Sequence, residues 1–139
     1  MATMLSNAAA AAMAGDGTNK GLLALMAGGS LVIYGTARPA NPDVATSGQT
    51  VLATYTLPSP AASQSNGVLT LLTVAAVTIG NTATAVWYRI YGAAGAGAPL
   101  VDGDILTSAG DGLVVSTASF VSGVTAGALT GGTVTVPVH

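Results

Sequence analysis

The sequence predicts a mainly β fold, either a β-sandwich or an open barrel of about seven or eight antiparallel strands, with a short N-terminal helical segment. Two observations lead to this prediction. From residue 30 onwards, short runs rich in Val, Thr, Leu and aromatic residues alternate with segments rich in Gly, Pro, Asn and Asp, as strands alternate with turns. Before residue 28, the composition favours helix instead.

The N-terminal segment is expected to be helical from Leu5 to about Ala27. The Ala8–Ala12 run has the highest helix propensity, and either Ser6 or Asn7 can cap it. The Gly15–Asn19 segment contains two glycines, so it should split or kink the helix.

The chain is expected to form a single domain, because 139 residues can bury one modest core but not two independent ones. Gly28 and Gly29 are a typical helix stop. We therefore expect residues 1–29 to form a helical segment that packs on the sheet or on a neighbouring subunit. Residues 30–139 are expected to form the β domain.

The strands of the β domain are predicted from alternation and from residue type. They are Leu31–Tyr34, Val51–Leu57, one bent or two short strands within Val68–Ile79, then Thr84–Tyr91, Leu100–Leu106, Leu113–Thr117, Ser119–Val124 and Thr133–Val138. The last of these contains Pro137, which cannot donate to a ladder and suits an edge. The Asp102-Gly103-Asp104 segment is interpreted as a β-turn.

The octapeptide TAVWYRIY, residues 84–91, holds three of the six aromatic residues. In a strand its side chains alternate between two faces, and both faces are largely apolar, which is typical of a central strand. We therefore predict that the core is built around aromatic and aliphatic side chains of this strand together with one tyrosine of an earlier strand. These core residues are Trp87, Tyr88, Ile90, Tyr91 and Tyr55.

Arg89 in the same strand needs an anionic partner, and the nearest candidates are Asp102 and Asp104 on the following strand region. We expect a structural salt bridge with one of them. The alternative is functional: Trp87, Arg89 and Tyr91 would form an exposed patch that binds carbohydrate or a protein partner.

The charge content limits the possible functions. Hydrophobic residues make up 50% of the chain and charged residues only 6%, with no Glu. A surface with so few charges is tolerated best when neighbouring subunits cover much of it, so we expect a component of an assembly. The three basic residues, Lys20, Arg38 and Arg89, are too few and too scattered to neutralise a phosphate backbone, and we expect no nucleic-acid binding.

Membrane insertion and secretion are also not expected. The longest apolar run, Leu69–Ile79, is interrupted by threonines and is shorter than the roughly 20 residues of a spanning helix. The Ala-rich N-terminus lacks the positive region of a signal peptide. There is no Cys, so disulfides and thiolate metal sites are excluded and the redox compartment stays undetermined.

Catalysis and cofactor binding lack suitable residues. The single His is His139, at the end of the printed chain, and there is no Glu or Cys to build an acid/base pair or a hydrolase triad. Asp102-Gly103-Asp104 does not supply the ordered oxygen ligands of a calcium loop, and Gly92–Gly97 lacks the spacing of a phosphate loop. We expect no enzyme activity, no catalytic residue, no cofactor and no metal site.

Six segments of the sequence, taken in order, resemble segments of a known group of proteins. They are LSNAAAAAM, LVIYGTARPANPD, GQTVLATYTL, AVWYRIYGAAG, VDGDI and the closing GGTVTVPV. Together they cover most of the chain, and the chain resembles a widespread group of small structural proteins of tailed bacteriophages. The resemblance implies a virion component without cofactor or catalytic residues, made in the cytoplasm of the host bacterium.

The role that this resemblance favours is that of a capsid decoration or cement protein on the outer surface of the capsid. Its partners would be the major capsid protein and copies of itself, in a homo-oligomer such as a trimer. A tail tube, tail-terminator or fibre-associated protein is the alternative of the same class, and a carbohydrate-binding β-sandwich is the alternative of another class. The candidate interface residues lie in the helical segment and in the loop Thr36–Ser47: Leu5, Met13, Leu22, Met26, Arg38, Pro39 and Pro42.

Overall fold

The computed structural model describes residues 4–7, 9, 21–66, 68–93, 97–110, 112–126, 129 and 133–135. The fold is mainly β, with antiparallel sheets and the short helix α2 (Gly21–Met26). The predicted fold class is therefore confirmed. Within the described ranges, no helix combines the length and the apolar character that crossing a membrane would require.

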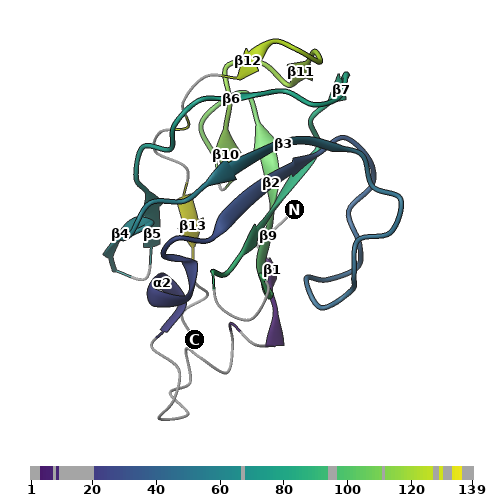
Figure 1. Ribbon diagram of the computed structural model, residues 1–139. Helices are drawn as coiled ribbons and strands as arrows, with labels where there is room; N and C mark the ends of the chain where they lie inside the picture. Colours follow the sequence, from purple (N-terminus) through teal and green to yellow (C-terminus); the bar gives the residue numbers. More distant parts are fainter. Residues whose placement is uncertain are drawn as a thin grey trace.

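The largest sheet forms the centre of the molecule (Figure 1). From one edge to the other, its strands are β1 (Met4–Leu5), β9 (Pro99–Leu106), β8 (Trp87–Tyr91), β2 (Ser30–Tyr34) and β3 (Val51–Thr56). Every pairing along this path is antiparallel. β10 (Leu113–Val114) adds to β9 in parallel, which is an exception to the antiparallel arrangement predicted from the sequence.

Three smaller sheets complete the described part of the fold. One consists of β4 (Ala62–Ser65), β5 (Val68–Leu71) and β13 (Thr133–Thr135), and the others are the pairs β6 (Val77–Thr78) with β12 (Thr125–Ala126) and β7 (Ala83–Thr84) with β11 (Ser119–Phe120). β6, β7, β11 and β12 lie together at the top of Figure 1. They are held there by pairings between segments about 40 residues apart.

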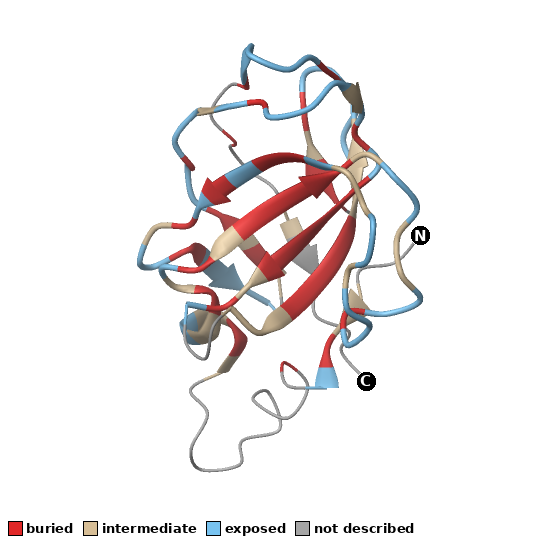
Figure 2. Cartoon of the chain, turned by 45° about the vertical axis from the view of Figure 1, so that its right-hand side comes forward, coloured by how far each residue is buried: buried red, intermediate tan, exposed pale blue. Residues whose placement is uncertain are grey.

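The central strands β2 and β8 are buried on both faces, and they are red along most of their length in Figure 2. Tyr88 and Ile90 of β8 belong to the main core, together with residues of β3, β5 and α2. Trp87 packs on the opposite face with Val32 and Tyr34 of β2. The alternation predicted for the octapeptide is confirmed, and β8 is a central strand because β2 and β9 flank it.

The predicted strands all overlap observed ones, but the structure adds β1, β4 and β12. Only the first residue of β4 is buried, so its sequence carries no alternation of apolar and polar residues that could have predicted it. Leu5 was expected to begin a helix, and this was wrong, because Met4 and Leu5 pair with Asp102 and Val101 of β9. Pro137 lies outside the described residues.

The prediction of a turn at Asp102-Gly103-Asp104 was also wrong, since these residues are extended within β9. Gly103 lies opposite Tyr88 in the neighbouring strand, and the tyrosine ring covers it. A Cβ added at Gly103 would come within 2.6 Å of the ring atoms Cε1 and Cζ of Tyr88. Glycine is therefore required here for close packing and not for a turn.

The described residues of the N-terminal segment show a local cap and packing against the core. Ser6 is buried, and its Oγ accepts a hydrogen bond of 3.1 Å from the backbone N–H of Ala9, which is the geometry of an N-cap. In α2, Leu22 and Met26 face the main core, four residues apart on one side of the helix. Met13 and the Gly15–Asn19 segment lie outside the described residues.

Candidate functional site: the β2–β3 loop and the sheet face beneath it

The β2–β3 loop, residues 35–50, is the longest described connection without an element of its own. It is the blue loop at the right of Figure 1. Its ends are tied together, because Gly35 N donates to Thr50 O at 3.0 Å and Thr50 N donates to Thr36 Oγ1 at 3.1 Å. The loop contacts the face of the central sheet that carries Trp87 and Arg89.

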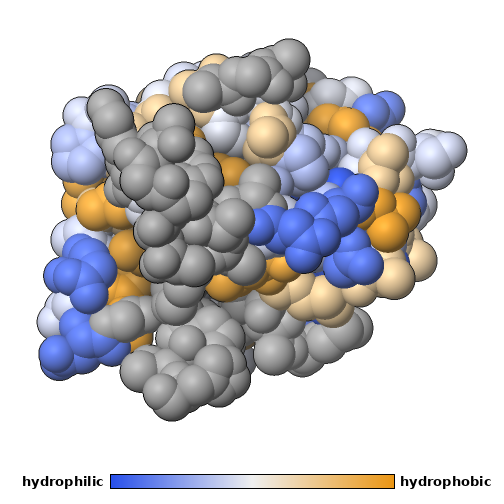
Figure 3. Space-filling model, turned by 90° about the horizontal axis from the view of Figure 1, so that it is seen from below, coloured by the Kyte–Doolittle hydropathy of each residue, from blue (hydrophilic) through white to orange (hydrophobic). Residues whose placement is uncertain are grey.

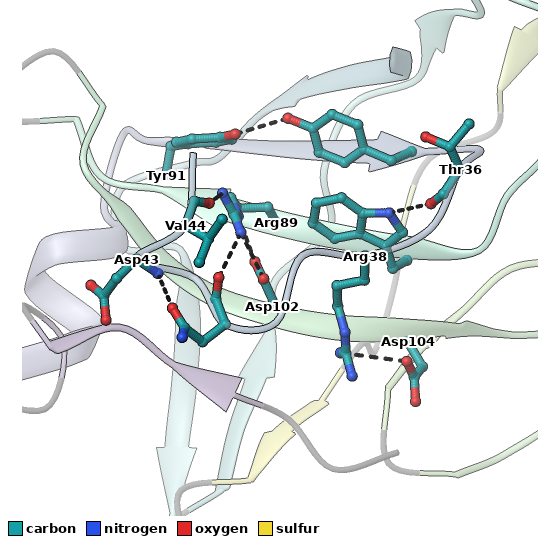
Figure 4. A network of polar contacts seen from close by, with 11 residues as sticks. Thr36, Arg38, Asp43, Val44, Arg89, Tyr91, Asp102 and Asp104 are labelled. Atoms are coloured by element: carbon teal, nitrogen blue, oxygen red, sulfur yellow. Dashed lines mark hydrogen bonds and ion pairs between the residues drawn. The ribbon is translucent and has the colours of Figure 1, made fainter. Parts of the chain in front are cut away.

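Arg89 and Asp102 form a buried ion pair beneath this loop (Figure 4). They are directly opposite each other on β8 and β9, and the Nε and Nη2 groups of Arg89 donate to Asp102 Oδ1 and Oδ2 at 2.6 and 2.8 Å. The side chains are only 1% and 0% exposed. Burial alone would lower the pKa of Arg89, but the hydrogen bonds and charge of Asp102 outweigh it and raise that pKa, so the guanidinium stays charged.

The same guanidinium also holds the loop. Arg89 Nη1 donates to Val44 O at 2.9 Å, and Nη2 makes a longer hydrogen bond of 3.3 Å to Asn41 O. Arginine has five N–H donors in a planar fork, so one side chain can bind a carboxylate and backbone carbonyls at the same time. Arg89 thus connects β8, β9 and the loop.

Aromatic side chains fill the space beside this ion pair. Tyr34 and Trp87 are stacked with ring centroids 4.3 Å apart and planes inclined by 12°, and the Arg89 guanidinium lies 5.4 Å from the Trp87 ring. Trp87 Nε1 donates to Thr36 O at 2.6 Å. The hydroxyls of Tyr34 and Tyr91 are 2.8 Å apart, and burial together with this hydrogen bond raises the pKa of Tyr34.

Further polar contacts fix the loop and the N-terminus. Arg38 Nη1 lies 3.5 Å from Asp104 Oδ1, in a second ion pair between the loop and β9. The Asp43 carboxylate accepts hydrogen bonds from the backbone N–H of Asn7 at 3.1 and 3.0 Å. Asn41 Oδ1 accepts from the N–H of Asp43 at 3.0 Å, which is an Asx-type turn within the loop.

The residues predicted for the core and the salt bridge are found at defined places. Trp87, Tyr88, Ile90 and Tyr55 are buried, and Tyr91 is half-buried against the Trp87 cluster. Of the two candidate partners of Arg89, the structure pairs it with Asp102, while Asp104 pairs with Arg38. The register between β8 and β9 decides this, because it places Asp102 opposite Arg89 and Asp104 opposite Trp87.

The residues predicted for an interface are mostly inside the molecule. Leu22 and Met26 are buried in the main core, so their apolar face serves this chain and not a partner. Arg38 has a side chain that is only 5% exposed, because it pairs with Asp104. Pro42 is buried and Pro39 is half-buried. Leu5 is half-buried against the core.

The loop Thr36–Ser47 was predicted as a contact segment, but its outer side is formed by residues other than Arg38, Pro39 and Pro42. Asn41, Asp43 and Val44 are exposed, and small residues of the loop are exposed beside them. The sequence offered one indication that this loop is held on the sheet. A buried guanidinium with one carboxylate partner has further N–H donors, and these donors need further acceptors. This indication does not identify which backbone carbonyls are the acceptors.

The described polar residues of the site form ion pairs and hydrogen bonds that hold the loop on the sheet. Among the described residues, no three His, Cys, Asp or Glu side chains lie close enough to hold a metal ion. Trp87 is fully buried below the loop, so a sugar ring could not stack on it without displacing the loop. What the site offers is a loop held rigidly against the sheet, with a small, almost uncharged outer surface.

Comparison with protein-family models, with curated proteins and with solved structures finds no match to this chain.

Proposed function

We propose that the protein is a non-enzymatic structural component of a tailed-bacteriophage virion, and specifically a capsid decoration or cement protein on the outer surface of the capsid. The resemblance of its ordered segments to small phage structural proteins suggests the class. The observation that carries the proposal is the near absence of ionised side chains from the described surface.

The chain has three basic and five acidic residues, and five of these eight belong to the described part. Arg89 and Asp102 are buried against each other, and Arg38 is almost covered by its pairing with Asp104. Asp43 is the one of these five that is classed as exposed, and its carboxylate accepts hydrogen bonds from Asn7 N–H. A surface of this kind does little to repel further copies, which favours a protein that works within an assembly.

The described surface is a mosaic and not one continuous hydrophobic area. Figure 3 shows hydrophilic residues gathered at two places on the lower face, with hydrophobic residues between and beside them. The exposed large hydrophobic residues are aliphatic: Val44, Val51, Leu72, Val86, Val121 and Val124. Contacts of modest strength, repeated over many copies, suit such a surface.

In the proposed mechanism, copies of this rigid domain form a homo-oligomer, such as a trimer, and bridge neighbouring subunits of the major capsid protein. Each bridge buries additional surface that must be exposed again before the shell subunits separate, and this stabilises the shell. We propose the outer side of the β2–β3 loop as the contact with the shell, because Arg89 and Trp87 hold its backbone in one conformation before binding.

The first test is the location of the protein in purified particles of the virus whose genome encodes it. Mass spectrometry measures whether the chain is present, and cryo-electron microscopy places it. Density on the outer capsid surface supports the proposal, and density in the tail supports the tail-protein alternative instead. Absence from the particles refutes a virion role.

The second test locates the contact with two matched variants. Val44 in the loop and Val86 beside β8 are 44% and 45% exposed, so Val44→Asp and Val86→Asp place the same charge at equally exposed positions. In co-sedimentation with shells of the major capsid protein, we expect V44D to bind more weakly than the natural chain and V86D to bind as well as it. Equal binding of all three proteins would exclude the loop as the contact.

A further inference from the structure

A pocket of about 360 Å³ lies between β3 and described residues of the 114–126 segment together with Leu129, and no residue of the β2–β3 loop is in its described lining. Two strand pairings hold its walls, since β12 is bound to β6 and β11 to β7. Ile79 N also donates to Val124 O, and Gly123 N donates to Ile79 O, both at 2.9 Å. The pocket is therefore formed by hydrogen-bonded backbone before any ligand binds.

The floor of the pocket is apolar. Its buried residues come from β3, from the end of β6 and from the β10–β12 region, and they are Tyr55, Ile79, Val115, Phe120, Ala126 and Leu129. A floor of aliphatic and aromatic groups stabilises a ligand by removing its apolar surface from water.

The rim of the pocket combines hydroxyl groups with exposed apolar side chains. Ser116, Thr117 and Ser119 are exposed and line the pocket, and Thr117 Oγ1 accepts a hydrogen bond from Ser119 N at 3.2 Å. Val121 and Val124, which are 47% and 53% exposed, stand beside them. The rim thus offers short, uncharged hydrogen-bonding groups next to apolar surface.

Among the described residues that line the pocket there is no Lys, Arg, His, Asp or Glu. The described lining contains one titratable group, the Tyr55 phenol, and burial raises its pKa, so the phenol is neutral at physiological pH. An ionised ligand would lose its hydration without gaining an opposite charge, and such transfer is costly. A neutral ligand avoids this cost.

We propose that this pocket binds a small, uncharged amphiphile whose apolar body fills the floor and whose hydroxyl group reaches the serine and threonine hydroxyls of the rim. The volume lies within the range of roughly 300–1,000 Å³ that is typical of small-molecule sites. This binding site is separate from the β2–β3 loop and does not depend on a virion role.

The test uses the full chain and the neutral fluorescent probe 1-aminoanthracene, whose emission rises in apolar surroundings. Three competitors with the same six-carbon chain then test the effect of ligand charge at pH 7. They are neutral 1-hexanol, anionic hexanoate and cationic hexylammonium. We expect 1-hexanol to displace the probe at concentrations at least about tenfold lower than either ion, because the pocket has no charged partner for them. Absence of probe binding, or equal displacement by all three, overturns the proposal.

Two matched variants and a methyl NMR spectrum test whether the probe binds in the pocket. Ser116→Trp puts an indole at the rim, and Ser63→Trp makes the same change at an exposed position in β4 that does not line the pocket. We expect the first variant to weaken probe binding by about tenfold or more and the second to leave it unchanged. In the natural chain, the probe should shift the methyl NMR signals of Ile79 and not those of Val86. Shifts confined to Val86, or equal binding by both variants, overturn the proposal.

Discussion

Arg89 donates two hydrogen bonds to Asp102 across neighbouring strands, with N···O distances of 2.6 and 2.8 Å, and both side chains are almost completely buried. Two further donors of the guanidinium bind Asn41 O and Val44 O in the β2–β3 loop. A single side chain therefore joins the sheet to the loop that covers it. The stability of the sheet and the order of the loop are coupled through this arginine.

Replacing Asp102 by Asn should destabilise the protein strongly. The variant leaves the Arg89 guanidinium buried without an opposite charge, and breaking one partner of a buried pair typically costs about 3–5 kcal/mol. Urea denaturation measures the free energy of unfolding. The double variant Arg89→Met/Asp102→Leu, which removes both charges, should be more stable than Asp102→Asn alone.

The matched control is Asp43→Asn, which makes the same change at an exposed carboxylate that accepts hydrogen bonds from the Asn7 N–H. Its effect should stay below about 1 kcal/mol, as for other exposed charges. If Asp102→Asn and Asp43→Asn proved equally mild, the fold would not depend on the Arg89–Asp102 ion pair.

Local patterns in the sequence predicted the strands and the two faces of β8 well. The alternation of Trp87, Tyr88, Arg89 and Ile90 is a property of neighbouring residues, so no knowledge of the rest of the fold was needed. The need of Arg89 for an anion was predictable for the same reason. Which aspartate would pair with it depends on the register between β8 and β9, and distant contacts set that register.

The wrong predictions have a common physical origin. Gly103 was interpreted as a turn residue, although its role is to leave room for the Tyr88 ring on the next strand. Leu22 and Met26 were interpreted as a surface for partners, although they complete the core of this chain. Periodicity shows that a helix has an apolar face, but it does not say which surface will cover that face.

Gly103→Ala should destabilise the sheet, because the new Cβ would lie 2.6 Å from ring carbons of Tyr88. Overpacking of this kind typically costs about 1–3 kcal/mol. Gly80→Ala is the matched control, since the nearest atom to its added Cβ is Leu52 O at 3.8 Å. Thermal unfolding should show a lower Tm for the first variant and almost no change for the second. Equal Tm values would mean that the tyrosine ring moves aside at no cost.

The stability of the protein should fall at alkaline pH. Burial raises the pKa of Tyr55 above its ordinary value of about 10, and the unfolded chain has that ordinary value. Below about pH 10 the phenol is neutral in both the folded and the unfolded state, so its contribution to the free energy of unfolding is fully present. At higher pH the unfolded chain loses this proton first, so unfolding becomes more favourable as the pH rises towards the folded pKa.

Tyr55→Phe removes this group and should make the decline shallower, by at most about 1.4 kcal/mol per pH unit. The free energies of unfolding of both proteins, measured in urea between pH 8 and about pH 11, give the two slopes. Tyr34, whose pKa is raised by burial and by its hydrogen bond to Tyr91, should leave a residual slope in the variant. Identical slopes for the variant and the natural chain would contradict the assignment to Tyr55.

Arg89→Lys should release the β2–β3 loop while leaving a positive charge beside Asp102. A lysine ammonium cannot bind a carboxylate in a bidentate manner and also reach the carbonyls of Asn41 and Val44, so the loop would lose these hydrogen bonds. Hydrogen–deuterium exchange of the loop amides should become faster in Arg89→Lys than in the natural chain. Arg38→Lys is the control variant. It makes the same substitution in the second ion pair, Arg38–Asp104, and leaves the Arg89 side chain in place. If exchange in residues 41–44 stayed as slow in Arg89→Lys as in the natural chain, the guanidinium would not be what orders the loop.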